Sequence, residues 1–167
     1  LKKKQLQAEI IKIHKQINDV AEKMQEVRNN VLAWVDVFAE EFDFKGYSVI
    51  KEIKTHTGNV AGIDMPVFDD VIFQEKDYDV LRTPLWVDAA MEALKEMRRH
   101  KAELDVLHQQ LNVVKDELRV TTQRVNLFEK VKIPEARERI RVIHIGLGEV
   151  RTAEVVRGKI AKAKIQR

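Results

Sequence analysis

The sequence predicts a mainly α-helical protein, a long antiparallel two-helix coiled coil whose connector contains a short β-hairpin at the end remote from the termini. Two apolar seams with heptad spacing, one in each half of the 167 residues, are the first observation. Composition is the second, because 34% of the residues are charged and only 6% are aromatic. Such a chain suits extended helices with much surface better than a compact enzyme core.

The first helix is expected over residues 1–42. Its apolar residues are spaced alternately four and three apart, and this period of 3.5 predicts a left-handed supercoil with a partner helix. Gly46 is a natural stop after the helix. The seam consists of Leu6, Ile10, Ile13, Ile17, Val20, Met24, Val27 and Val31, and it continues to Trp34 and Phe38.

The partner is expected to be a second helix over residues 86–132. Thr83 and Pro84 supply an N-cap and a proline for the first turn. Because one connector joins the two helices, they must run antiparallel. Trp86, Ala90, Ala93, Met97 and His100 begin its seam, which continues with Leu104, Leu107, Leu111, Val114, Leu118, Thr121, Val125 and Phe128.

Residues 133–167 should continue this helix after a kink or short break at Pro134, since proline removes a backbone hydrogen bond and crowds the preceding turn. The apolar pattern then resumes from Ala136 to Val150. The chain opens within a helical pattern and without Met, so we expect further residues before Leu1, which would supply a partner for this stretch. Residues 157–167 form a basic end with a charge of +5.

The connector, residues 43–85, differs in kind from the helices. Nine of the ten aromatic residues lie between 34 and 86, which predicts a small compact knob there. Two runs rich in β-branched residues flank Gly58 and Asn59, and this pattern indicates a β-hairpin at about 47–66 with a two-residue turn at that pair. Residues 64–82 carry six acids and a net charge of −4.

The residue types exclude several kinds of chemistry. No Cys is present, so disulfides, thiolate zinc sites and cysteine nucleophiles are ruled out. The five His residues have no metal-ligand spacing, the acids lack the spacing of an EF-hand, and the pair Gly146 and Gly148 follows no strand. No signal peptide and no membrane span is visible. We therefore expect no cofactor, no metal and no catalytic residue.

Three stretches resemble the D subunit of the V-type rotary ATPases and ATP synthases. Residues 57–66 read TGNVAGIDMP, which is similar to the family's Asn-Ile-Ala-Gly-Val-x-x-Pro signature with Val60 in place of Ile. Residues 121–129 read TTQRVNLFE and run into Ile133 and Pro134, like the family's Arg-Val-Asn motif before Ile-Pro. Residues 3–6 read KKQL, like the start of the family's first helix.

The resemblance implies a non-catalytic rotor component of the central stalk, cytoplasmic and peripheral to the membrane, that couples ATP hydrolysis or synthesis to proton or sodium transport. Its implied partners are the F subunit, the catalytic hexamer of A and B subunits, and the funnel-like subunit above the membrane ring. The implied coupling hairpin comprises Gly58, Asn59, Val60, Ala61, Gly62 and Ile63. The implied hexamer-facing basic end comprises Arg157, Lys159, Lys162 and Lys164.

Two alternatives remain open at this point. A coiled-coil scaffold or tether would use the same seam only to hold partners apart. A nucleic-acid-binding coiled coil would use the basic end to neutralise phosphates. That end has no interleaved aromatic residues, and the net charge of +3 does not require a nucleic-acid partner.

Overall fold

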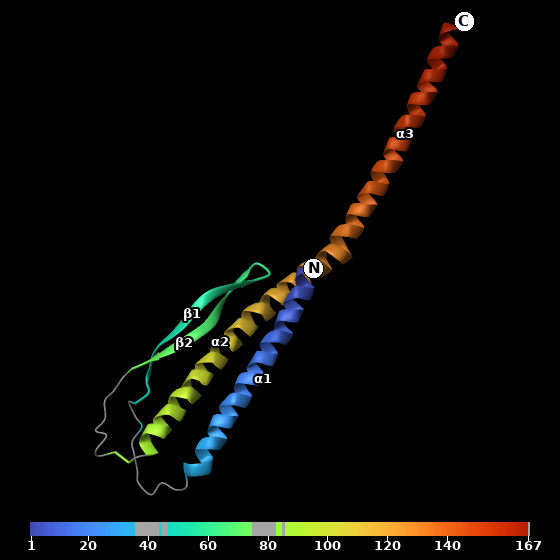
Figure 1. Ribbon diagram of the computed structural model, residues 1–167. Coiled ribbons are helices and arrows are strands. Elements are labelled where there is room, and N and C mark those ends of the chain that lie inside the picture. Colours follow the sequence, from blue (N-terminus) through green and yellow to red (C-terminus); the bar gives the residue numbers. More distant parts are fainter. Residues whose placement is uncertain (36–43, 45–46, 75–82, 85, 167) are drawn as a thin grey trace. The chain divides into compact units, whose positions relative to one another are not determined.

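A computed structural model of the chain confirms the mainly helical class with a two-stranded hairpin between the helices (Figure 1). It describes residues 1–35, 44, 47–74, 83–84 and 86–166. The elements follow in the order α1 (Lys2–Val35), β1 (Ile50–Val60), β2 (Ile63–Phe73), α2 (Trp86–Leu127), a π-helix η1 (Phe128–Lys132) and α3 (Ile133–Ile165). Residues 1–119 and 120–167 form two compact units, which are described separately below.

In the first unit, α1 and α2 pack through the two heptad seams. Leu6, Ile13 and Val20 of α1 are buried in one apolar cluster with Leu107, Leu111 and Val114 of α2. Removing each such side chain from water stabilises the fold by about 1.5–3 kcal/mol, which is why heptad spacing on both helices produces this pair. The remaining seam positions of this unit with described side chains are half-buried, namely Ile10, Ile17, Met24, Val27, Val31, Trp86, Ala90, Ala93, Met97, His100, Leu104 and Leu118.

The hairpin is longer than expected, and its turn lies elsewhere. Val60 pairs with Ile63, so the two turn residues are Ala61 and Gly62. The expected turn at Gly58 and Asn59 is therefore wrong, because both residues lie in β1. A type I′ turn needs positive φ at both central residues, and Ala61 (53°) and Gly62 (79°) meet this need.

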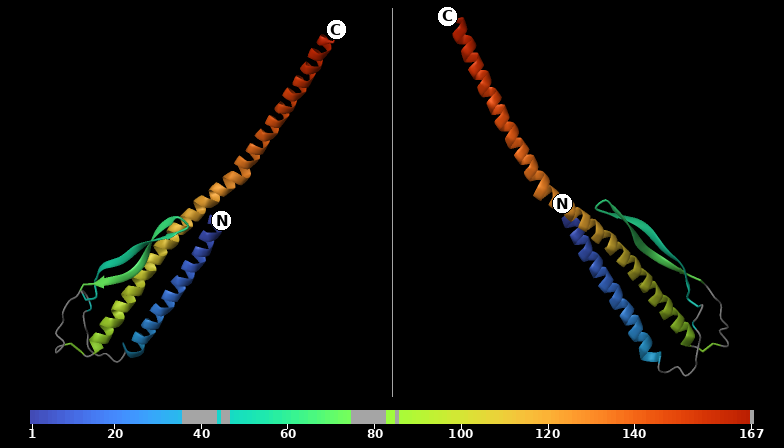
Figure 2. Two further views of the ribbon diagram at one scale, coloured as in Figure 1. Left: turned by 45° about the horizontal axis from the view of Figure 1, so that its top comes forward. Right: turned by 180° about the vertical axis from the view of Figure 1, so that it is seen from behind.

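The hairpin does not form a compact knob at the far end of the helices, as the sequence had led us to expect. It runs alongside α2, as both views of Figure 2 show, and its turn comes back towards the start of α1. Met65 is buried in the same cluster as Leu6 and Leu111, with Val60, Ala61 and Ile63 packed against it. The helices therefore supply the apolar surface that a two-stranded ribbon lacks on its own.

The connector contacts α2 just before the hairpin begins. Ser48 is buried with a positive φ of 58°, and the side chain of Arg98 donates a hydrogen bond to its carbonyl oxygen. The rings of Phe44 and Trp86 meet at a centroid distance of 6.0 Å. Three of the nine aromatic residues expected in the knob, Phe38, Phe42 and Tyr78, lie outside the described residues, as does the expected end of the first helix at residue 42.

In the second unit, the expected kink or break at Pro134 takes the form of the π-helix Phe128–Lys132. The N–H of Ile133 bonds to the carbonyl of Phe128, five residues back, and α3 then starts with Pro134 in its first turn. The seam pattern that resumes at Ala136 lies eight residues after Phe128, one residue more than the seven of a heptad. One inserted residue would rotate an α-helix by about 100°, and the wider π turn takes up that extra residue.

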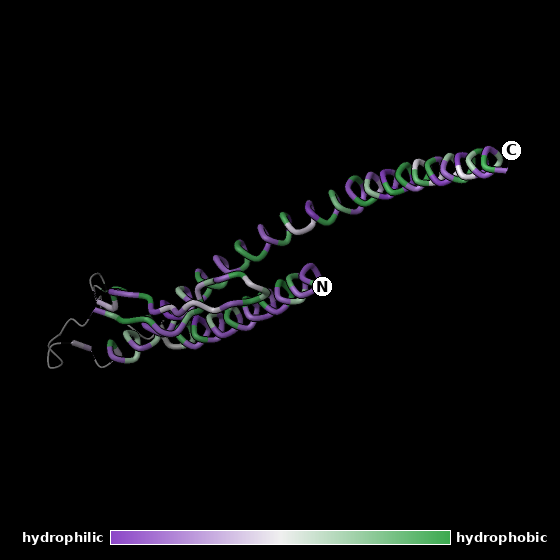
Figure 3. Tube along the Cα trace, turned by 90° about the horizontal axis from the view of Figure 1, so that it is seen from above, coloured by the Kyte–Doolittle hydropathy of each residue, from purple (hydrophilic) through white to green (hydrophobic). Residues whose placement is uncertain are grey.

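Apolar residues alternate with polar ones along α3, as Figure 3 shows, and they are exposed in the structure. Ile140, Ile143, Leu147 and Val150, where the seam pattern resumes, are each about half exposed or more. Val125 is half-buried, but Phe128, expected in the seam, is 57% exposed. The buried part of the seam on α2 ends at Val114, near the point where Lys2 of α1 pairs with Glu117.

Candidate functional site

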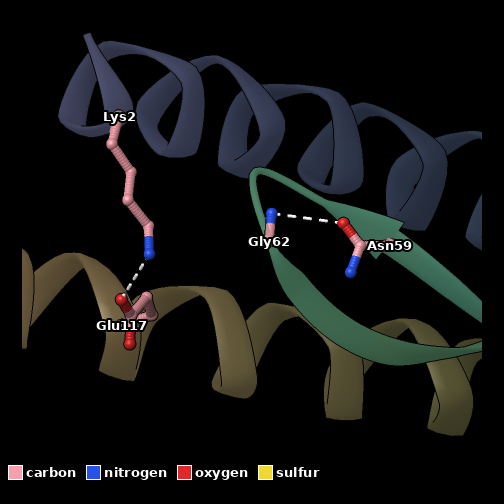
Figure 4. A network of polar contacts seen from close by, with 4 residues as sticks. All are labelled: Lys2, Asn59, Gly62 and Glu117. Carbon is pink, nitrogen blue, oxygen red and sulfur yellow. Dashed lines mark hydrogen bonds and ion pairs between the residues drawn. The ribbon is translucent and has the colours of Figure 1, made fainter.

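The turn of the hairpin is held by a small polar network around Asn59 (Figure 4). The side-chain amide of Asn59 donates to Asp64 Oδ1 at 2.6 Å, across the strand pair. Its Oδ1 accepts the backbone N–H of Gly62 at 3.2 Å. Asn59 therefore uses both its donor and its acceptor to close the two-residue turn, which explains an asparagine at this point of the hairpin.

Gly58 is needed because another side chain comes close to its backbone. A Cβ built on Gly58 would lie 2.6 Å from Cγ2 of Val67, whereas carbon atoms in contact sit about 3.5–4.0 Å apart. A Cβ on Gly62 would meet no atom within 4 Å, and that position favours glycine through its φ of +79° instead. The two glycines of the motif thus serve different physical needs.

The apolar residues of the motif fix the turn to the helices. Val60, Ala61 and Ile63 pack against the core cluster of α1 and α2. The buried Gln110 of α2 donates its side-chain N–H to the carbonyl oxygen of Pro66 at 2.6 Å. The hairpin is therefore joined to the coiled coil both by apolar packing and by a hydrogen bond from a buried side chain.

An ion pair ties the two helices together in the same region. Lys2 Nζ lies 2.8 Å from Glu117 Oε1 and joins the start of α1 to α2, as Figure 4 shows. Both side chains are partly exposed, at 43% and 28%, so the pair contributes at most about 1 kcal/mol. The pair joins the first turn of α1 to the turn of α2 that contains Glu117.

Residues 64–82 contain an acidic cluster, and its members that the structure describes all have partners within the chain. Asp64 accepts from Asn59, the carboxylate of Asp69 lies 2.7 Å from His56 Nδ1, and that of Asp70 lies 3.1 Å from Arg99. The other acids of the cluster lie outside the described residues. Within the described part of the chain, no group of three His, Asp or Glu side chains could hold a metal ion.

The basic end lies on α3 and faces solvent. Arg157, Lys159, Lys162 and Lys164 are all exposed. Nearer the start of α3, a side-chain hydrogen bond from Arg141 lowers the pKa of the Glu138 carboxyl. Among the described helices, none is both long enough and apolar enough to cross a membrane.

Two contacts of the site could not be identified from the sequence. Gln110 precedes the seam residue Leu111 and resembles any solvent-facing glutamine of a coiled coil, yet it is buried under the hairpin. His56 and Asp69 pair across the bulge between the strands. The sequence does not show that such a residue is buried, because its burial depends on another element, here the hairpin, that packs over it.

Comparisons with known proteins agree over almost the entire chain. A family model that describes the D subunit of ATP synthase matches residues 1–163. The V-type ATP synthase D subunit of Borreliella burgdorferi is 41% identical over 165 residues, which cover 99% of this chain and 82% of that protein. The V-type ATP synthase D subunits of Chlamydia abortus and Chlamydia caviae are 32% and 31% identical, and each alignment covers 99% of this chain and 81% of the relative.

Proposed function

The chain belongs to the family of ATP synthase D subunits, and we propose that it is the central rotor shaft of a V-type ATP synthase. In this role it catalyses nothing itself. It carries torque between a catalytic hexamer of A and B subunits and the membrane rotor, and so couples ATP hydrolysis or synthesis to proton or sodium transport. Its place is cytoplasmic and peripheral to the membrane.

The attachment of the hairpin to the coiled coil is the observation that carries this proposal. A shaft must move as one body, and a coupling element must be fixed to it so that a turn of the helices moves the element too. Met65 is buried among seam residues of both helices, and Gln110 holds the backbone at Pro66. Any rotation of the α1–α2 pair would therefore carry the turn at Ala61 and Gly62 with it.

The exposed surface suits the other expected contacts. Cationic side chains at Arg157, Lys159, Lys162 and Lys164 would face the hexamer, where a charged surface can turn inside a sleeve without tight packing. The F subunit and the funnel-like subunit would bind the shaft elsewhere. Apolar side chains along α3 are exposed in this chain, so we expect α3 to contact other subunits in the assembled complex.

Single-molecule rotation tests the proposal. A bead attached to this chain in a complex reconstituted with the hexamer should rotate in steps when ATP is added. Fixed attachment with intact ATPase activity would instead support a tether and overturn the rotor.

The role of the turn is tested separately with Gly62→Val. Valine is strained at a φ of +79°, whereas the α1–α2 seam is left unchanged, so coupling should fall while helicity is retained. Gly146→Ala is the matched control, because its Cβ would lie in open space on α3. If the Gly62→Val chain stimulated ATP hydrolysis normally, the proposed role of the hairpin in coupling would be wrong.

A further inference from the structure

The two sides of the α1–α2 seam are buried to different extents. We letter each heptad a to g with the seam at a and d. Because a helix turns by about 100° per residue, position a lies beside e and position d lies beside g. From residue 6 to 20 and from 104 to 118, every d residue is buried, and every a residue except Leu111 is half-buried. The buried d residues are Leu6, Ile13, Val20, Leu107 and Val114, and the half-buried a residues are Ile10, Ile17, Leu104 and Leu118.

The hairpin accounts for the better buried side. Gln110, a g residue, donates to the carbonyl oxygen of Pro66, and the turn of the hairpin packs against the core cluster. The e residues along the same stretch are all exposed, namely Gln7, His14, Ala21, Lys101, His108 and Lys115. These e residues and the half-buried a residues beside them form one surface with an apolar centre, which we call the e face.

The charges on the two sides of the seam also differ. The g positions from 2 to 30 and from 89 to 117 hold four acids and two lysines, and Lys2 pairs with Glu117 across the seam. The e positions from 7 to 28 and from 94 to 115 hold no acid, so the two helices cannot pair opposite charges there. Cations at these e positions and at the neighbouring b positions number six against one acid, Asp105; they are Lys4, Arg28, Arg98, Lys101, Lys115 and Arg119.

Most of these cations are available to a partner. Arg98 donates to the carbonyl oxygen of Ser48, and Arg119 lies 3.8 Å from Asp116. Within the described part of the chain the other four, Lys4, Arg28, Lys101 and Lys115, have no ion-pair partner. The acids of the hairpin do not offset them, since Asp70 pairs with Arg99, a c residue on roughly the opposite side of α2 from e.

We propose that the e face binds an acidic amphipathic helix of a partner protein. Its apolar residues cover Ile10, Ile17 and Leu104, and its acids meet the cations beside them, in the helix-in-groove mode of recognition. The e positions recur every seven residues, about 10 Å along the axis, and a second helix laid along the face repeats with the same spacing. A strand, which rises about 3.3 Å per residue with alternating sides, falls out of step with them. The proposal goes beyond rotation, because it concerns what this face binds whether or not the chain turns.

A fluorescent peptide of three repeats of Glu-Ile-Ala-Ala-Leu-Glu-Gln tests the site by anisotropy with the whole chain. It should bind, and Lys101→Glu combined with Lys115→Glu should weaken binding at least about tenfold. Lys15→Glu combined with Lys95→Glu is the matched control, because both lysines are exposed at f positions away from the e face and the net charge changes equally. Circular dichroism checks that each variant is folded.

A unique thiol extends the test to the assembled complex, since the chain has no cysteine. Ala21→Cys places the thiol on the e face, and Ala8→Cys places it at an exposed f position. The peptide should slow maleimide labelling at Cys of the first variant at least about tenfold and leave the second unchanged. Labelling of the first variant should also slow in the ATP synthase complex, and this measurement does not depend on the lysine variants being folded.

Several results would overturn the proposal. Peptide binding that is absent, or unchanged by the Lys101 and Lys115 reversals, would contradict the cationic contacts. Equal binding of the peptide with Lys in place of Glu would remove the acidic preference, and equal binding with Ser in place of Ile and Leu would remove the apolar contact.

Other occupants have their own signatures. Slower labelling that grows with the concentration of the isolated chain would assign the face to a second copy, and slower labelling by duplex DNA but not by the acidic peptide would assign it to nucleic acid. Unchanged labelling in the complex would show that no subunit covers the face. A chain that enters the complex without rotating would contradict the rotor function and leave the peptide result standing.

Discussion

The close approach of Val67 to Gly58 allows a quantitative test of the hairpin structure. Gly58→Ala would place a Cβ 2.6 Å from Cγ2 of Val67, about 1 Å closer than carbon atoms prefer. Overpacking of this kind costs about 1–3 kcal/mol, partly offset by about 0.4–1 kcal/mol because alanine restricts the unfolded chain. We expect the free energy of unfolding of the chain to fall by about 1–2 kcal/mol.

A double-mutant cycle separates this clash from other effects of alanine. Val67→Ala removes the offending methyl group and should cost about 1 kcal/mol alone, since the side chain is only half-buried. The double variant should be more stable than the sum of the single changes predicts, by about 1–2 kcal/mol. Urea unfolding followed by circular dichroism, together with amide exchange in the β1–β2 ladder, measures each variant.

Gly62→Ala is the matched control for this cycle. Its Cβ would meet no atom within 4 Å, but its φ of +79° is unfavourable for alanine, at a cost of about 1–2 kcal/mol. Val67→Ala should not relieve that cost, so the second cycle should be additive. Additive energies for Gly58 and Val67, or a Gly58→Ala chain as stable as the unaltered one, would refute the packing argument.

Three further predictions concern the helices. Leu111→Asp puts a charge into the core cluster, so unfolding should become easier by at least about 3 kcal/mol, and an unchanged melting temperature would remove Leu111 from the core. Gln110→Leu leaves the Pro66 carbonyl without its partner, which should cost about 1–3 kcal/mol and speed amide exchange in the hairpin more than in α1. Arg141→Gln should raise the pKa of Glu138 in an NMR titration. Because the folded-state pKa of Glu138 is lowered, the contribution of its pair with Arg141 is present above the unfolded pKa and is lost as pH falls through the folded one. An unmoved midpoint in the variant would contradict the hydrogen bond.

The sequence alone determined the helices, because a heptad pattern is a local property. Residues such as Leu107, Leu111 and Val114 recur every three or four positions, and any helix with that spacing needs a partner. The runs of β-branched residues on either side of Gly58 and Asn59 likewise predicted a hairpin in the connector. Composition was sufficient to exclude disulfide and thiolate chemistry, since both require cysteine and the chain has none.

The position of the hairpin turn and the surface that it packs against follow from contacts between distant parts of the chain. Gly58 and Asn59 resemble a turn pair, yet Gly58 provides room for Val67 and Asn59 bonds to the turn made by Ala61 and Gly62. Each of these roles depends on an atom from another part of the fold. Local propensity cannot choose between two glycines that both suit a turn. Val60, Ala61 and Ile63 pack against the helices. This packing favours the turn at Ala61 and Gly62 over one at Gly58 and Asn59.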